Sequence, residues 1–223
     1  MTLVEVAVET LRSALAAENG GAGRIELCAN LDEGGTTPDA GLIASLVERL
    51  RIPLAVIIRP RAGGFVYSDD EIRIMDVDIA RARRLGVRGI VAGVLRADRR
   101  IDVDRARAFV DTAAGLPLTF HRAFDETPDL PEALEDVIAT GAARLLTSGG
   151  AASAPEGADA IAALVEQARG RIAIIAGGSI REHNVRELIA RTRVGEIHTR
   201  LSAGEEIDEA RMRRFTELAR REA

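Results

Sequence analysis

Aromatic residues and cysteine are scarce in this chain of 223 residues, and tryptophan is absent. Aromatic residues make up only 3% of the sequence, with a single tyrosine, whereas a nucleic-acid platform that stacks bases needs several aromatic rings. The one cysteine, Cys28, excludes a disulfide within the chain and any Cys-x-x-Cys motif. This cysteine usage is typical of a reducing compartment, so we expect a cytoplasmic location.

Long apolar runs and an excess of positive charge are missing as well. No apolar run reaches the roughly 18 residues that indicate a membrane-spanning helix, and residues 1–5 lack the basic and apolar regions of a signal peptide. The formal net charge is −5, and most arginines lie among acidic residues on helical segments, whose charged faces we interpret as solvated. We therefore expect neither a membrane nor a nucleic acid as a partner.

Eight short apolar runs are separated by segments with helical periodicity, and they recur about every 20–35 residues, the length of a βα unit. Eight such units predict an α/β fold with a single (β/α)8 TIM barrel, and a doubly wound sheet is the alternative. The Gly-x-Gly-x-x-Gly motif typical of that alternative does not follow the first run, where the sequence is Val8-Glu9-Thr10. The runs are 3–8, 24–28, 54–58, 89–92, 118–120, 144–147, 172–176 and 196–199.

Local signals mark several helix ends. Thr37 followed by Pro38 predicts a helix start with Thr37 as the N-cap, and Ser68 with Glu71 predicts a capping box. Glycines before three of the strands predict left-handed helix ends, in Gly20-Gly21-Ala22-Gly23, at Gly86 and at Gly141.

Cations follow two of the apolar runs at the point where each run stops. Arg59-Pro60-Arg61 follows the third run, and His121-Arg122 follows the fifth. In parallel α/β folds the carboxyl ends of the strands open onto the ligand site. The same pattern thus predicts both the strands and the location of a site.

Strand alternation places further polar side chains inside the predicted barrel. Three interpretations stay open. The inward carboxylates pair with arginines and seal the core, or the cluster is a ligand-binding or active site in which His121, Glu26 and Glu5 are catalytic and His121 is the acid or base. The third is a hard-metal site formed by Glu5, Glu26, His121 and His198. The residues expected to converge at the barrel mouth are Glu5, Glu26, His121, His198, Arg59 and Arg61.

Glycine-containing loops after the last two predicted strands favour an anion site. Barrel enzymes often bind phosphate at these two loops, and arginine can hold a phosphate or carboxylate with two hydrogen bonds. The alternatives are that the glycines only form tight turns and that the arginines neutralise internal glutamates. Under the anion interpretation the binding residues are Arg59, Arg61, Gly177, Gly178, Ser202 and Gly204.

Cys28 ends the second run and is a candidate nucleophile or soft-metal ligand. A lone cysteine at the end of an apolar strand is more often an inert buried thiol. Cys28 and His198 are the candidate metal ligands, whereas His183, at a predicted helix start, is interpreted as solvated surface.

These motifs together resemble the CutC family over about residues 3–204, nearly the whole chain. The resemblance depends on the combination, because each motif alone is unspecific. The matching stretches are Arg24-Ile25-Glu26-Leu27-Cys28-Ala29, Glu33-Gly34-Gly35-Thr36-Thr37-Pro38, Ile57-Ile58-Arg59-Pro60-Arg61, Tyr67-Ser68-Asp69, Gly93-Val94-Leu95, Thr119-Phe120-His121-Arg122-Ala123-Phe124-Asp125, Leu146-Thr147-Ser148-Gly149 and Ala176-Gly177-Gly178.

The resemblance implies a single TIM-barrel domain over residues 1–223, a cytoplasmic location and a homo-oligomer, either a dimer or a tetramer. It also implies a role in copper homeostasis with copper-ion binding. Copper as a cofactor is suggested by the resemblance only.

Two features depart from the family pattern. Copper(I) binding in the family is attributed to cysteines, whereas this chain has only Cys28, and Cu(I) prefers two or more soft sulfur ligands. The methionines do not lie beside Cys28, because Met1 is at a terminus and the other two, Met75 and Met212, are on predicted helices. The second departure is that the loop after the eighth run is short. Three hypotheses follow: a CutC-like protein of copper homeostasis, a TIM-barrel enzyme acting on a small anionic metabolite at the barrel mouth, and a non-catalytic oligomeric scaffold whose mouth is filled by salt bridges.

Overall fold

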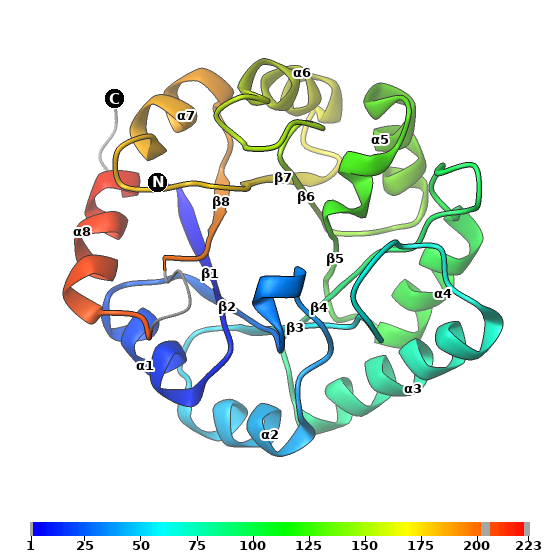
Figure 1. Cartoon of the computed structure of the whole chain (residues 1–223), viewed down its shortest axis with the longest axis horizontal. Helices are drawn as coiled ribbons and strands as arrows, with labels where there is room; N and C mark the ends of the chain where they lie inside the picture. Colours follow the sequence, from blue (N-terminus) through cyan, green and yellow to red (C-terminus); the bar gives the residue numbers. More distant parts are fainter. Residues whose placement is uncertain (1, 202–205, 221–223) are drawn as a thin grey trace.

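Eight parallel strands close into one barrel in the order β1 to β8, in a computed structural model that describes residues 2–201 and 206–220. Figure 1 looks down this barrel and shows the strands as an inner ring inside a ring of helices. The predicted (β/α)8 TIM barrel is confirmed. The strands are β1 Leu3–Val8, β2 Arg24–Leu27, β3 Leu54–Ile57, β4 Gly89–Ala92, β5 Leu118–Phe120, β6 Arg144–Thr147, β7 Ala173–Gly177 and β8 Glu196–Thr199. The predicted runs differ from these bounds by one residue at β2, β3 and β7 only.

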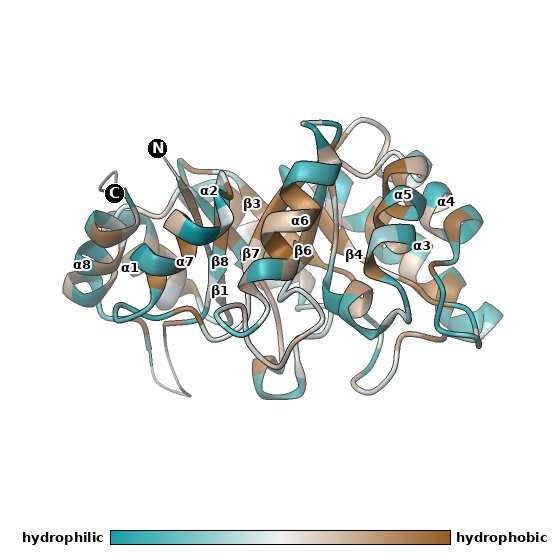
Figure 2. Ribbon diagram, turned by 90° about the horizontal axis from the view of Figure 1, so that it is seen from above, coloured by the Kyte–Doolittle hydropathy of each residue, from teal (hydrophilic) through white to brown (hydrophobic). Residues whose placement is uncertain are grey.

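Each strand is followed by an α-helix, and Figure 2 shows apolar residues concentrated on the strands and mixed faces on the helices. The helices are α1 Leu11–Asn19, α2 Ala40–Arg49, α3 Asp69–Leu85, α4 Val103–Ala113, α5 Leu130–Ala139, α6 Ala158–Ala168, α7 Val185–Thr192 and α8 Glu209–Arg220, with 3-10 turns η1 Leu31–Glu33 and η2 Arg122–Glu126. Within residues 2–201 and 206–220, no helix is both long and apolar enough to cross a bilayer.

The predicted helix ends are confirmed with one exception. Ser68 and Glu71 form the capping box of α3, and left-handed glycines follow the helices at Gly21, Gly86 and Gly141. Thr37 is not an N-cap, because Asp39 caps α2 and α2 starts at Ala40. The Thr37 side chain and amide are instead bonded to the backbone of Arg59, so this residue joins the loops after β2 and β3.

Two separate apolar clusters follow from strand alternation. The larger one fills the space between the strands and the helices. The smaller one lies inside the barrel on the side of β2, β3 and β4, where Cys28, Ala55, Ile57 and Val91 pack together. Polar side chains such as Glu26 and His198 share the mouth end of the interior with the apolar Ala7 and Leu146.

A buried ion-pair network lies at the amino-terminal end of this interior. Arg24 donates to Glu5 and, at 2.5 Å, to Glu196, whose carboxylate also lies 3.4 Å from Nε of Arg144. Glu5 is fully buried and Arg24 is 5% exposed. This part of the interior matches the interpretation in which carboxylates and arginines seal the barrel.

Candidate functional site

A pocket of about 280 Å³ opens at the carboxyl end of the barrel. Its walls come from strand ends and from the loops that follow β2, β3, β5, β7 and β8. Four residues expected at the mouth line it: Glu26, Arg59, His121 and His198. The position expected from strand alternation is therefore correct for these four, whereas their catalytic and binding roles stay predictions.

Glu5 and Arg61 do not line this pocket. Glu5 lies closer to the amino-terminal end of the barrel. It is paired in register with Arg24, the first residue of β2, and its carboxylate is bonded to the Arg24 guanidinium. The expected position of Arg61 is wrong. Its guanidinium pairs with Glu71 at 2.5 Å and donates to the carbonyls of Ala62, Gly64 and Val66, so it fixes the loop before α3.

Arg59 holds the rim of the pocket together. Its terminal nitrogens donate to the carbonyls of Glu33 (3.0 Å), Gly35 (2.9 Å) and Gly63 (2.6 Å). The guanidinium lies 4.9 Å from the ring centroid of Phe65. The sequence predicted that Arg59 holds an anion with two hydrogen bonds. Because its terminal nitrogens already bind backbone oxygens, Arg59 is poorly placed for that role. It is instead a fixed positive charge in the pocket wall.

Glu26 and His198 form a hydrogen-bonded pair in the pocket, with Nε2 of His198 2.5 Å from the Glu26 carboxylate. The Glu26 side chain is 4% exposed and that of His198 is 16% exposed. Although burial opposes the charged ring, the charge and hydrogen bond of Glu26 raise the pKa of His198 above its ordinary value. The imidazole of this pair therefore holds its proton more firmly than a free imidazole does.

His121 is buried and carries a different protonation state. Burial, followed by the positive charge of Arg59, lowers its pKa to about 4, so the ring is neutral at pH 7. Nδ1 accepts a hydrogen bond from the amide of Ala123 at 3.2 Å, which assigns the ring proton to Nε2. Within the described part of the chain, Nε2 has no partner. His121 thus lines the pocket with an N–H group that is buried and, among the described residues, unpartnered.

Gly93 makes room for this imidazole. A Cβ atom at position 93 would lie 2.7 Å from two atoms of the His121 ring, closer than real side chains approach. The ring of Phe65 packs on the other side, with centroids 4.9 Å apart. The ring orientation is therefore set by packing as well as by the hydrogen bond to Ala123.

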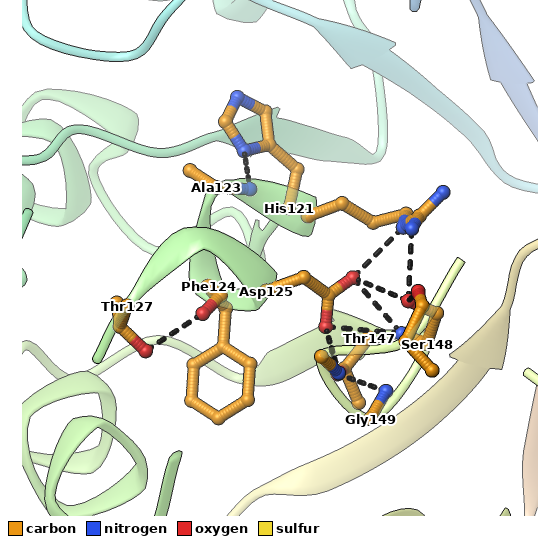
Figure 3. A network of polar contacts seen from close by, with 11 residues as sticks. His121, Ala123, Phe124, Asp125, Thr127, Thr147, Ser148 and Gly149 are labelled. Carbon is orange, nitrogen blue, oxygen red and sulfur yellow. Dashed lines mark hydrogen bonds and ion pairs between the residues drawn. The ribbon is translucent and has the colours of Figure 1, made fainter. Parts of the chain in front are cut away.

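Arg122 lines the pocket and is positioned by Asp125, at the centre of the network in Figure 3. The Asp125 carboxylate accepts from Nε of Arg122 at 2.8 Å, from the hydroxyl of Thr147 at 2.5 Å and from the amide of Ser148. Nη2 of Arg122 also donates to the Ser148 hydroxyl at 2.8 Å. This network ties η2 to the loop after β6, which places the Arg122 guanidinium at the pocket wall.

Arg181 and Arg200 complete the cationic lining, and the sequence did not identify them as site residues. Nη2 of Arg200 pairs with the exposed Asp32 at 2.8 Å, while its buried Nε has no partner among the described residues. Burial and the positive charges of Arg211 and Arg200 lower the pKa of Arg181. Arg200 follows His198 by two residues, so alternation along β8 puts both on one face, whereas no local pattern distinguishes Arg181 from the many helix-surface arginines.

The two glycines at the end of β7, Gly177 and Gly178, have different structural roles. Gly178 lines the pocket with φ of 112°, a conformation that favours glycine. Gly177 does not line the pocket; a Cβ there would lie 2.5 Å from Leu146, so it permits close packing. Ser202 and Gly204, the other expected anion-binding residues, lie outside the described residues.

Cys28 lines the pocket wall as a free and buried thiol. Burial, together with the Glu26 and Glu5 carboxylates, raises the pKa of its thiol well above the ordinary value. A thiol that resists ionisation is a poor nucleophile. His183 is exposed at the start of α7, as the sequence predicted.

Comparison with known proteins identifies the family. The model of the CutC family matches residues 2–204. A CutC family protein of Xanthomonas axonopodis pv. citri is 49% identical over 195 residues, which cover 87% of this chain and 81% of that protein. A CutC family protein of Chromobacterium violaceum is 48% identical over 196 residues, covering 88% of this chain and 79% of that protein.

Solved structures agree with this result. The crystal structure of a protein from Streptococcus agalactiae, described as a copper homeostasis protein CutC, superposes with a TM-score of 0.85 at 37% identity, over 91% of this chain and all of that one. Phosphoribosylanthranilate isomerase from Thermotoga maritima, at 14% identity and a TM-score of 0.65 over 98% of each chain, shares the fold alone. The family match over nearly the whole chain and the identity to these relatives show that this chain belongs to the CutC family.

Proposed function

We propose that this protein is an acid–base enzyme that binds a small anionic metabolite at the barrel mouth. The observation that carries the proposal is the charge of the pocket. Four arginines line it, namely Arg59, Arg122, Arg181 and Arg200, whereas Glu26 is the one carboxylate of the lining among the described residues and is already paired with His198.

This positive charge is only partly neutralised. Arg122 and Arg200 each have a carboxylate partner, but Arg59 and Arg181 have none within ion-pair distance among residues 2–201 and 206–220. Positive side chains gathered in a concave pocket attract anions and raise their local concentration. Burial, followed by the charges of Arg211 and Arg200, lowers the pKa of Arg181, and a phosphate or carboxylate bound beside this guanidinium would offset that cost.

The neutral His121 and the Glu26–His198 pair supply the acid–base groups of the proposed reaction. The neutral His121 can donate its Nε2 proton to a developing negative charge on a substrate oxygen, and the Glu26–His198 pair can accept or return a proton. Schiff-base chemistry is excluded for the side chains of this sequence, because all 30 of its Lys and Arg residues are arginines. Proton transfer on an anionic substrate is the reaction type that these residues support.

Binding of inorganic phosphate, citrate or sugar phosphates should raise the melting temperature. A ligand at about 100 times its Kd stabilises the folded state by roughly 2.7 kcal/mol, which corresponds to a shift of roughly 5–10 °C for a domain of this size. Arg181→Gln should weaken binding about 10- to 150-fold, because it removes a charged hydrogen-bond donor. A thermal-shift screen of the wild type and the variant measures both effects.

Arg61→Gln is the matched control for that screen. Arg61 follows β3, whereas Arg181 follows β7; it lies outside the pocket and pairs with Glu71. The control variant should keep the full anion-dependent shift. A screen in which no anion stabilises the wild type, or in which both variants respond equally, would contradict the proposal.

The sulfur atoms of this chain bear on the copper role that the family name suggests. Cu(I) prefers two or more thiolates or thioethers. Cys28 packs against Ala55, Ile57 and Val91 inside the barrel, while Met75 and Met212 are buried on α3 and α8 in the outer core. Among the described residues no second sulfur accompanies Cys28, so these donors do not fit a Cu(I) site.

Cu(I) should therefore bind to this protein no more tightly than to a lone thiol. Competition with a Cu(I) chelator under reducing conditions measures the affinity, with Cys28→Ser as the comparison. Tight one-to-one binding that disappears in Cys28→Ser would show that the thiol finds a soft partner, for example across an oligomer interface.

Cytoplasmic location, assembly into a dimer or tetramer, and the lack of a nucleic-acid partner stay predictions. Sedimentation of the purified protein would determine its oligomeric state. Assembly does not enter the argument for the anion site, because all residues in that argument belong to one chain.

A further inference from the structure

Three metal-ligating side chains meet at the floor of the mouth pocket. One carboxylate oxygen each from Glu5 and Glu26 and one ring nitrogen of His198 lie within 4.8 Å of one another. The residues come from β1, β2 and β8, which are hydrogen-bonded neighbours in the barrel, and Glu5 pairs directly with His198 in the β1–β8 register. The rigid sheet therefore fixes the relative positions of these ligands.

Glu5 provides a second and independent observation. Its side chain is fully buried, Oε2 is bonded to Arg24, and Oε1 has no partner among the described residues. A buried carboxylate oxygen without a partner is costly, because desolvation is not compensated by a hydrogen bond. The Glu5 carboxylate belongs to the cluster with Glu26 and His198, so a cation bound there would compensate its unpartnered oxygen.

We propose that Glu5, Glu26 and His198 bind a divalent transition-metal cation such as Zn²⁺, Co²⁺ or Mn²⁺. Two carboxylates and one imidazole suit these ions and not the soft Cu(I). Metal–ligand bonds of about 2.0–2.2 Å put neighbouring ligand atoms of a tetrahedral ion roughly 3.5 Å apart. Small side-chain movements would therefore complete the site, in which Nε2 of His198 and the Glu26 carboxylate, now 2.5 Å apart, move away from each other. The proton between Glu26 and His198 is released when the ion binds, because metal ligands must be deprotonated, so the pair acts as an acid–base group only in the metal-free protein.

The surroundings of the cluster support this assignment. Arg24 holds Glu5 from behind, as a hydrogen-bonding neighbour commonly does for a ligating carboxylate. Glu5, Glu26 and Glu196 together exceed Arg24 and Arg144 by one negative charge when His198 is neutral.

The ion also has an entry path. Glu26 and His198 face the mouth pocket, so it enters from there. Three protein ligands leave a coordination position open, as in catalytic metal sites. The inference does not depend on anion binding, because the metal can be measured in buffer without anionic ligands.

Titration of metal-free protein with Co²⁺, followed by visible absorption, tests the site, and calorimetry with Zn²⁺ gives the affinity. We expect one ion per chain. Glu5→Gln should lower the affinity at least about 10-fold, since even neighbours of ligands have effects of that size. Glu196→Gln is the matched control: it removes a carboxylate from the same Arg24 network that is not part of the cluster, and its metal affinity should stay nearly unchanged.

His198→Asn provides a second test in case Glu5→Gln does not fold, which the melting curve of metal-free protein will show. It should also lose the Co²⁺ absorption. The proposal is overturned if the wild type binds no stoichiometric ion, because a proton then occupies the cluster instead. It is also overturned if binding survives in His198→Asn, or is lost in Cys28→Ser, which would place the ion at the thiol.

Discussion

Replacing Arg24 with methionine is expected to lower the free energy of unfolding by about 3–5 kcal/mol, because removing one partner of a buried ion pair leaves an uncompensated charge. Arg24 is 5% exposed and is bonded to both Glu5 and Glu196. Methionine fills a similar volume but cannot donate a hydrogen bond. Glu5, fully buried inside the barrel, would then have no partner on either oxygen among the described residues. Urea denaturation of the wild type and the variant measures the loss.

Two controls separate the buried charge from other causes of destabilisation. The double variant Glu5→Gln/Arg24→Met removes the stranded charge and should recover part of the loss. Arg51→Met removes an arginine whose side chain is 81% exposed and paired with Glu18, and its cost should be within about 1 kcal/mol. An Arg24→Met variant as stable as Arg51→Met would mean that the network contributes little to the barrel.

The second large effect is a loss of stability at acidic pH caused by His121. Its pKa is about 4 in the folded state and 6.5 as the ordinary value. Above pH 6.5 the ring is neutral in both states and contributes nothing. Between pH 6.5 and pH 4 the unfolded state binds the proton and the folded state does not, so stability falls as the pH falls. The difference of about 2.5 pH units corresponds to about 3 kcal/mol.

Comparison with His121→Asn isolates this contribution. The stability of the wild type minus that of the variant should be constant above about pH 6.5 and should decrease by about 3 kcal/mol on acidification to pH 4. His183→Asn, a change at an exposed histidine, is the matched control. The pH dependence of its free energy of unfolding should equal that of the wild type. NMR titration of the His121 ring gives the pKa directly. A value near 6.5 would contradict the predicted loss of stability at acidic pH.

Much of the fold could be predicted from the sequence, because each strand carries its own local signal. β-branched and aliphatic runs of three to six residues mark all eight strands, and the capping box at Ser68 and the glycine at position 86 mark the ends of α3. These are short-range effects of backbone sterics and hydrogen bonding. The helix start at Thr37 was predicted incorrectly because a contact with Arg59, 22 residues away, engages this side chain.

Part of the candidate site could also be predicted, because side chains on a strand alternate with a period of two. Alternation placed Glu26, His121 and His198 correctly at the carboxyl end of the barrel. Alternation could not predict that Glu5 lies farther from the barrel mouth than Glu26, because the position along the barrel axis depends on the stagger between neighbouring strands. Alternation also could not predict the position of the Arg61 guanidinium, because Arg61 lies beyond the end of β3 and its long side chain pairs with Glu71.

The sequence by itself determined the barrel, the end at which its polar residues gather and the CutC family resemblance, because strand propensity, alternation and motif order are local properties of the chain. Only the tertiary structure decided which charges are neutralised. Arg24 is matched to Glu5, Glu26 to His198, and Arg122 to Asp125, whereas Arg181 has no carboxylate partner among the described residues. Ion pairing depends on distances of a few ångströms between residues up to 172 positions apart, and these distances are set by barrel closure.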